Sequence, residues 1–314
     1  NYKRQLSKIF LDKLKNNKDI SIIQDENTEK IPLFSIDFKD YNNKNVNFFL
    51  NEIGLLSNSS TFYCNRLFCD NNLNIQEGLL RISLMHYNNI SEVEKICDYI
   101  NLFQLKKLKF EFSKINSNLI DDDLKKSFDN LPTDKYYINK RNRRFSLLKV
   151  KNKKIDIIGN LKFYQSDNYN SFNGNIARDY ENIEKNLLEN NSFNKMILDF
   201  NNKVEKEYKS NNNYLQIHQI RVYADNKSVN LVPEGIHQDG FNIVGICCIN
   251  KNNIDGGISQ LYDINKNLIY RDNLNSGDMI ILNDRKLYHD VSNIELKNKE
   301  KIGFRDIFVI TTLS

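Results

Sequence analysis

The chain has 314 residues, 40% of them hydrophobic and 11% aromatic, so it is long enough to bury a core, and two domains are the natural expectation. Its 45 lysines and arginines against 40 aspartates and glutamates give a net charge of +5, which is too small to indicate a nucleic-acid-binding protein. No run approaches the roughly 18 apolar residues of a membrane span, no secretory signal is recognisable, and five irregularly spaced cysteines favour free thiols in a cytoplasmic protein.

The first hundred residues predict a small α+β domain. Apolar residues at helical spacing predict helices over 2–15 and 45–53. Strands are predicted at 20–23, 32–38 and 79–85. A capping-box pattern at Ser91–Glu94 opens a further helix. The order helix, strand, strand, helix, strand, helix is that of an α+β sandwich.

Four runs within this segment carry a family resemblance: Pro32–Phe38, Gly54–Leu56, Phe62–Cys64 and Leu80–Asn89. They resemble the C-terminal small domain of class V aminotransferases and cysteine desulfurases. In that family the arginine matching Arg81 binds a substrate carboxylate, and a cysteine close to Cys64 carries sulfur. The large domain that holds pyridoxal phosphate does not precede Asn1, so we expect residues 1–105 to be a fragment of a longer fusion and Cys64 to be structural. An upstream pyridoxal-phosphate domain of the full-length protein is then a candidate partner.

A lysine-rich stretch from Leu105 to Ser117 predicts the domain boundary, which places the second domain at 118–314. Beyond it, the pattern predicts a short helix over 121–128 and helical structure over 180–208 with a break near Asn190. Residues 215–223 alternate as a strand does, with Arg221 on one face and His218 on the other. We expect His218 to be a buried, hydrogen-bonded histidine and not a metal ligand.

The motif His237-Gln238-Asp239 is the first sign of chemistry. On an extended strand the two flanking side chains point to the same face, so an imidazole and a carboxylate converge. The third ligand is His289, which we expect at the end of the buried strand that begins with the apolar run 279–282. Two histidines and one carboxylate suit a non-haem Fe(II) site, with zinc as the second choice of metal.

Arg305 is the second sign. The run 304–310 alternates as a strand, and an arginine buried in it needs an anion to offset its desolvation. A bidentate guanidinium fits a carboxylate. Turn residues at 255–257 and 276–278 predict antiparallel connections between the strands around it.

Further runs upstream extend this pattern: Leu131–Tyr137, Arg143–Phe145, Phe163–Ser166, and Tyr169–Gly174 with Arg178. From about residue 119 to 314 the chain resembles the 2-oxoglutarate- and Fe(II)-dependent dioxygenases, specifically the bacterial free amino-acid hydroxylases that include L-isoleucine hydroxylase. The resemblance implies a mainly β, double-stranded β-helix (jelly-roll, cupin-like) domain with buttressing helices. It also implies iron ligation by His237, Asp239 and His289, and a clamp by Arg305 on the distal carboxylate of 2-oxoglutarate.

The implied activity is hydroxylation of a free L-amino acid with Fe(II), 2-oxoglutarate and O2. The substrate carboxylate needs a cation, for which Arg178 and Arg221 are the candidates, with surface salt bridges as the alternative. Halogenation is disfavoured because related halogenases lack the ligating carboxylate that Asp239 supplies. Two other functions stay open: a non-catalytic metal-binding regulatory module attached to a pyridoxal-phosphate enzyme, and sulfur or amino transfer by the missing half. The sequence indicates no oligomeric state.

Overall fold

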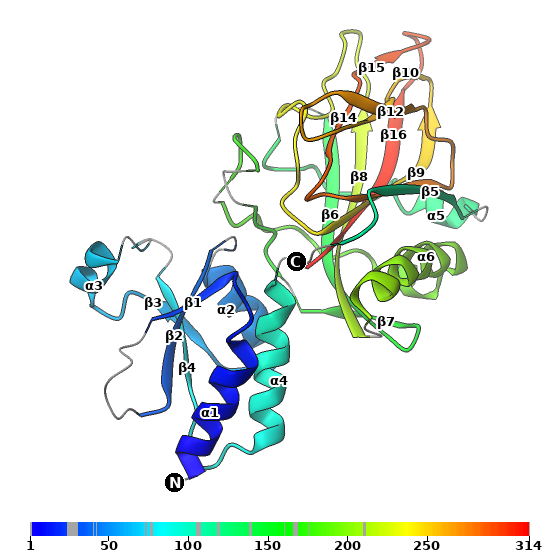
Figure 1. Cartoon of the computed structure of the whole chain (residues 1–314). Helices are drawn as coiled ribbons and strands as arrows, with labels where there is room; N and C mark the ends of the chain where they lie inside the picture. The colour runs from blue at the N-terminus through cyan, green and yellow to red at the C-terminus, as the bar shows by residue number, and fades with distance from the viewer. Residues whose placement is uncertain are drawn as a thin grey trace. The chain divides into compact units, whose positions relative to one another are not determined.

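The structure is a computed structural model, coloured along the chain in Figure 1. It describes residues 2–23, 31–39, 41, 43–71, 73, 75, 78–104, 108–117, 120–137, 140–159, 161–165, 169–174, 176–209 and 212–313. The chain divides into two compact units, Asn1–Lys106 and Lys107–Ser314. The domain limits expected from the sequence, 105 and 118, fall on residues outside this description. Among the described helices there is none with the length and hydropathy of a membrane span.

The first unit combines helices with one antiparallel sheet. Its elements are α1 (Tyr2–Leu14), β1 (Ile20–Ile23), β2 (Leu33–Phe38), α2 (Asn43–Glu52), β3 (Asn58–Ser60), α3 (Asn65–Asp70), β4 (Leu79–Ser83), α4 (Ile90–Ile100) and a 3-10 turn (η1, Asn101–Phe103). The strands are ordered β1-β2-β4-β3. Helix α1 buries Leu6, Phe10 and Leu14, spaced four apart, and the Phe10 ring stacks on Phe34 of β2 at 4.4 Å. This periodic apolar face is what the sequence pattern anticipated.

Two details of this unit differ from expectation. The capping box of α4 is formed by Asn89 and Glu92, each bonding the other's backbone N–H, and not by Ser91 and Glu94. Asparagine is as good an N-cap as serine, so the helix starts at the earlier of two overlapping signals. Residues 57–69, for which the sequence pattern predicts irregular or extended structure, contain the short strand β3 and also the start of helix α3, which was not predicted.

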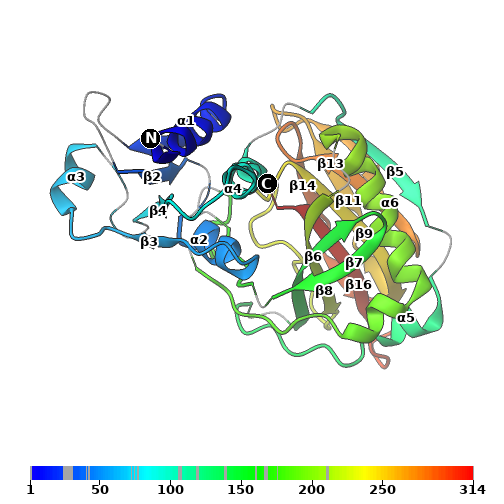
Figure 2. The ribbon, with the colours of Figure 1, turned by 90° about the horizontal axis from the view of Figure 1, so that it is seen from below.

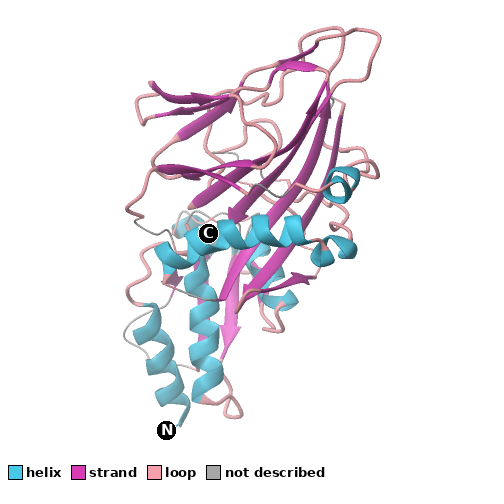
Figure 3. Cartoon of the chain, turned by 90° about the vertical axis from the view of Figure 1, so that its right-hand side faces the viewer, coloured by secondary structure: helices cyan, strands magenta, loops and turns pink. Residues whose placement is uncertain are grey.

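The second unit is built on a seven-stranded antiparallel sheet ordered β5-β13-β9-β16-β8-β6-β7. These strands are β5 (Phe112–Asn116), β6 (Arg141–Lys151), β7 (Lys154–Ile158), β8 (Asn212–Tyr223), β9 (Ile243–Asn252), β13 (Asp278–Asn283) and β16 (Phe304–Thr312). Figure 3 shows its long strands side by side. Because β5 pairs with β13, the second unit includes residues 112–116, which precede the expected start at 118.

Two smaller antiparallel sheets complete this unit. The first is ordered β12-β11-β14, from β11 (Ser259–Tyr262), β12 (Leu268–Asp272) and β14 (Tyr288–Val291). The second pairs β10 (Ile254–Gly256) with β15 (Ile294–Leu296). All pairings among the described strands are antiparallel, and this mainly antiparallel arrangement is consistent with the predicted jelly roll.

Helices cover one face of the large sheet. They are α5 (Asp122–Lys126), the 3-10 turn η2 (Lys185–Glu189) and α6 (Asn191–Tyr208). Figure 2 shows α6 running across the strands, and Phe193, Phe200 and Val204 of this helix join one buried apolar cluster with side chains of β8, β9, β13 and β16. The expected break near Asn190 is present, because this residue caps α6 by accepting from the Phe193 N–H. The functional site described below lies on the opposite side of this sheet.

Candidate metal centre

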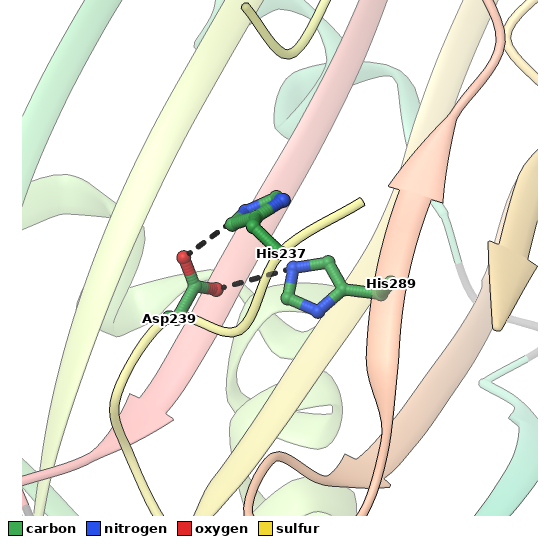
Figure 4. A group of neighbouring side chains, drawn as sticks. All are labelled: His237, Asp239 and His289. Atoms are coloured by element: carbon green, nitrogen blue, oxygen red, sulfur yellow. Dashed lines mark ion pairs between the residues drawn. The ribbon is translucent and has the colours of Figure 1, made fainter. Parts of the chain in front are cut away.

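Three side chains converge on the side of the large sheet opposite the helices, between it and β11 and β14: His237, Asp239 and His289. Figure 4 shows both imidazoles facing the carboxylate, one toward each of its oxygens. The Nε2 atom of His237 lies 3.5 Å from one Asp239 oxygen, and that of His289 lies 3.5 Å from the other. One nitrogen or oxygen from each residue fits within 4.8 Å of the others. Such a donor set, two imidazoles and a carboxylate, suits Fe(II) and leaves further coordination positions open.

The backbone that delivers these side chains differs from the expectation in two ways. His289 does not end the strand of the apolar run 279–282, because β13 stops at Asn283 and His289 lies in β14 of the small sheet. His237 is not in a continuous strand. It forms one isolated bridge with His289, in which each backbone N–H donates to the other's carbonyl, at 3.1 and 2.9 Å. This bridge sets the two imidazoles side by side.

The protonation of the triad follows from its burial. Burial and the neighbouring His237 lower the pKa of His289 to about 4, so this imidazole is neutral. Burial would also lower the pKa of His237, but the Asp239 carboxylate and the Gly235 carbonyl outweigh it and raise that pKa to about 9. The His237 Nδ1–H donates to the Gly235 oxygen at 2.9 Å, so the other ring nitrogen, Nε2, is the one that faces Asp239. A divalent metal ion binding there replaces the proton on Nε2.

Asp284 connects two of the three ligands. Its carboxylate accepts hydrogen bonds from the backbone N–H groups of Asp239, Gly240 and Phe241, at 3.1, 2.7 and 3.0 Å. Its Oδ1 atom also lies 3.7 Å from the outer nitrogen, Nδ1, of His289. Gly240 is required in this turn because its φ is +91° and a Cβ would lie 2.6 Å from the Tyr169 ring. Asp284 was not predicted from the sequence, where its only signal is a carboxylate shortly before the second histidine.

Gln165 holds Asp239 from the other side. Its Nε2 donates to the Asp239 backbone oxygen at 3.1 Å and to its Oδ1 at 3.2 Å. The Gln165 oxygen in turn accepts from Arg178 at 2.9 Å and from Asn170 at 3.2 Å. Arg178 is fully buried and does not line the cavity beside the triad. The structure therefore places this predicted substrate residue behind Gln165, where it positions the amide.

Arg221, the other predicted substrate residue, faces away from the triad. Its guanidinium forms a bidentate ion pair with Asp306 at 2.6 and 2.8 Å, and Nη1 bonds Asp129 at 2.7 Å. It does not line the cavity either. Strand alternation explains this, because Arg221 lies on the face of β8 opposite His218. The alternative expected for Arg221 was a surface salt bridge; the structure has an ion pair, but its Arg221 and Asp306 side chains are buried.

The cavity beside the triad, called here the triad cavity, has a volume of about 140 Å³ and lies between the large sheet and β11 and β14. Arg305 lines it. This guanidinium is only 4% exposed, and its Nε and Nη2 atoms have no hydrogen-bond partner among the described residues. Gly257 gives it room, since a Cβ there would lie 3.2 Å from Arg305 Cδ. A buried cation with unused donors fits an anionic carboxylate, as the distal end of 2-oxoglutarate requires.

His218 lies on the wall of the same cavity. Its ring stacks on Phe145 at 4.6 Å, and its Nδ1 atom accepts from Arg143. The structure therefore confirms the expected buried, hydrogen-bonded histidine, and His218 is not among the residues that surround the metal position.

The model of the 2OG-Fe dioxygenase family matches residues 125–311, and that of the class-V aminotransferases matches residues 1–96. Among solved structures, a BsmA homologue from Methylobium petroleophilum PM1 is 17% identical, with a TM-score of 0.58 over 65% of this chain and 88% of its own. IDO from Bacillus thuringiensis is 18% identical, with a TM-score of 0.53 over 64% and 93% of the two chains. At such identities the likeness concerns the fold. A comparison with curated proteins finds no match.

Proposed function

Because the chain belongs to the 2OG-Fe dioxygenase family, an oxidoreductase family that uses Fe(II), 2-oxoglutarate and O2, we propose that His237, Asp239 and His289 hold the iron. Arg305 then takes the distal carboxylate of 2-oxoglutarate. The observation that carries this assignment is the convergence of two imidazoles and one carboxylate within 4.8 Å beside a cavity that also contains a buried arginine with unused donors. When bound, the iron centre oxidises a substrate C–H bond with O2 while 2-oxoglutarate is converted to succinate and CO2.

The chain's own residues prepare this chemistry. The neutral His289 and the ionised Asp239 present lone pairs to the metal, and the single carboxylate leaves a positive charge that attracts the anionic cosubstrate. Arg305 orients 2-oxoglutarate from its far end, because a planar guanidinium binds a carboxylate in one plane. Gln165 and Asp284 fix the direction of Asp239 through hydrogen bonds. Such support keeps the ligands in place before the metal binds.

The proposed substrate is a free L-amino acid, and the proposed outcome is hydroxylation. The triad cavity is small, which suits a small molecule. Its apolar wall includes Ile220, Val222, Leu231, Ile307 and Val309, which can hold an aliphatic side chain and exclude water from the reacting centre. Halogenation is disfavoured because Asp239 occupies the position of the carboxylate ligand.

One screen tests the proposal. The protein is reconstituted with Fe(II) under nitrogen, 2-oxoglutarate and each of the twenty amino acids are added, and O2 is admitted. We expect succinate release that is stimulated by at least one amino acid, together with a product heavier by one oxygen atom. The control is His289→Ala, which lacks a ligand and should release no succinate. A wild-type protein that releases none under any of these conditions would refute the proposal.

A further inference from the structure

Three arginines line the triad cavity: Arg305, Arg141 and Arg143. Arg305 is assigned to 2-oxoglutarate, so no ligand is yet assigned to the two cations on β6, Arg141 and Arg143. Because side chains alternate along β6, Arg143 and its neighbour Arg144 lie on opposite faces of the strand. Arg144 points away from the cavity and donates to the backbone oxygens of Asn182 and Asn130. The cavity wall formed by β6 is therefore positively charged beyond what the cosubstrate needs.

Arg143 is the more buried of the two, with an exposure of 6%. Its Nε and Nη2 atoms lie 3.2 and 2.7 Å from Nδ1 of His218. Burial, and then the neighbouring arginines, hold the pKa of His218 well below its usual value, so this partner is neutral and does not offset the charge. The nearest described carboxylate oxygen, Oδ2 of Asp134, is 3.9 Å from Nη1, which is beyond hydrogen-bonding distance.

The surroundings add positive charge. Arg141 bonds the Leu231 carbonyl and stacks 4.3 Å from the Tyr137 ring, and Arg178 bonds the Gln165 amide. None of these partners carries a full negative charge. Asp134 is the one described carboxylate near Arg143, and at 3.9 Å it makes no hydrogen bond to the guanidinium. A buried guanidinium that otherwise faces cations and neutral groups is costly unless a hydrogen-bonded anion completes the site.

We propose that Arg143 binds the carboxylate of the substrate, in the place that the sequence analysis gave to Arg178 or Arg221. This inference rests on the proposed function and names the recognition element of the same cavity. Glu234 lines the cavity as well, where its carboxylate accepts from the Tyr137 hydroxyl at 3.4 Å. A cation and an anion that line the same cavity complement a zwitterion, and the apolar lining residues complement an aliphatic side chain.

Binding is measured without turnover. The full chain is loaded with Fe(II) and 2-oxoglutarate under nitrogen, and the weak visible charge-transfer band of that complex is followed during titration with L-isoleucine, L-leucine or L-valine. Each amino acid is compared with its carboxamide, which keeps the ammonium and the side chain but lacks the negative charge. The variants are Arg143→Met, Arg143→Lys and, as a matched control on the opposite face, Arg144→Met.

In the wild type and in Arg144→Met we expect at least one amino acid to perturb the band and its carboxamide to bind far more weakly. In Arg143→Met the dissociation constant of that amino acid should rise roughly 30- to 300-fold, and the preference over the carboxamide should vanish, because a charge-assisted contact is lost. Arg143→Lys should lie between the two, since it keeps the charge without the planar fork. The band with 2-oxoglutarate in each variant reports that the protein is folded.

Two results overturn the inference while leaving the iron and 2-oxoglutarate assignments standing. One is an Arg143→Met protein that still prefers the amino acid over its carboxamide. The other is a wild-type band that none of the three amino acids perturbs. A wild-type protein that forms no band with 2-oxoglutarate would instead refute the proposed function, and the inference would fail with it.

Discussion

The removal of one charge at Asp284 tests whether this carboxylate supports the metal site. In Asp284→Asn the side chain keeps one oxygen and gains an amide NH2 group. With the oxygen directed to the N–H groups of Gly240 and Phe241, the NH2 group faces the backbone N–H of Asp239 and the outer nitrogen of His289. At Asp239 a donor then meets a donor, and at His289 the NH2 group takes the place of the carboxylate oxygen that lies 3.7 Å from Nδ1.

The expected cost follows from these contacts. A buried donor without an acceptor costs about 1–3 kcal/mol, and loss of a ligand's outer partner weakens metal binding by roughly 10- to 100-fold, or about 1.4–2.7 kcal/mol. We therefore expect the dissociation constant for Co(II) to rise by a factor in that range. Burial and the nearby Asp239 raise the pKa of Asp284 to about 7, so asparagine also removes a costly buried charge. For this reason Tm without metal should change by less than about 5 °C.

The assay is a competition titration of Co(II) against a chelating dye, followed by the visible spectrum of the bound ion. Asp290→Asn is the matched control, because it removes the same charge next to His289 but from a carboxylate whose only described hydrogen bond is with the Val291 N–H. Its Co(II) affinity should stay within about threefold of the wild type, since this half-buried carboxylate makes no described hydrogen bond or ion pair with a ligand residue. Equal affinities of Asp284→Asn and wild type would refute the positioning role.

Further outcomes are expected at other positions. His237→Ala should lose stoichiometric iron and iron-dependent succinate formation while its circular dichroism stays unchanged, and retained turnover would exclude it as a ligand. Arg305→Ala should weaken 2-oxoglutarate binding by about 2–5 kcal/mol with iron affinity nearly unchanged, as measured by titration of the visible band. Arg221→Met should leave Asp306 buried and unpaired, lowering the free energy of unfolding by about 3–5 kcal/mol without changing the response to amino acids; a changed response would return Arg221 to the substrate site. Residues 107–314 alone should retain measurable 2-oxoglutarate turnover, because the triad and Arg305 all lie within them, and a folded, iron-loaded but inactive fragment would contradict this.

Local patterns in the sequence were sufficient for several features of the second unit. The spacing of His237 and Asp239, the alternating run around Arg305 and the apolar positions of α6 depend on residues close together in the chain. His289 was chosen for its place after the apolar run 279–282, and the family resemblance supported that choice, because no local spacing relates it to the other two ligands. These predictions agree with the structure in that the three side chains and Arg305 line one cavity.

The choice among the arginines required the tertiary structure. Arg143, Arg178 and Arg221 have equal charge and all lie in runs singled out from the sequence, but their roles differ with the face they occupy and with partners far along the chain. Arg221 is neutralised by Asp306 and Asp129, 85 and 92 positions away, while Arg143 faces the cavity beside a neutral histidine 75 positions away. Asp284 likewise matters only because the chain returns to place it under the turn after Asp239. The face of a strand on which a side chain lies follows from alternation, a local property that the sequence reveals. The charged groups that lie next to that side chain depend on how the strands pair and pack.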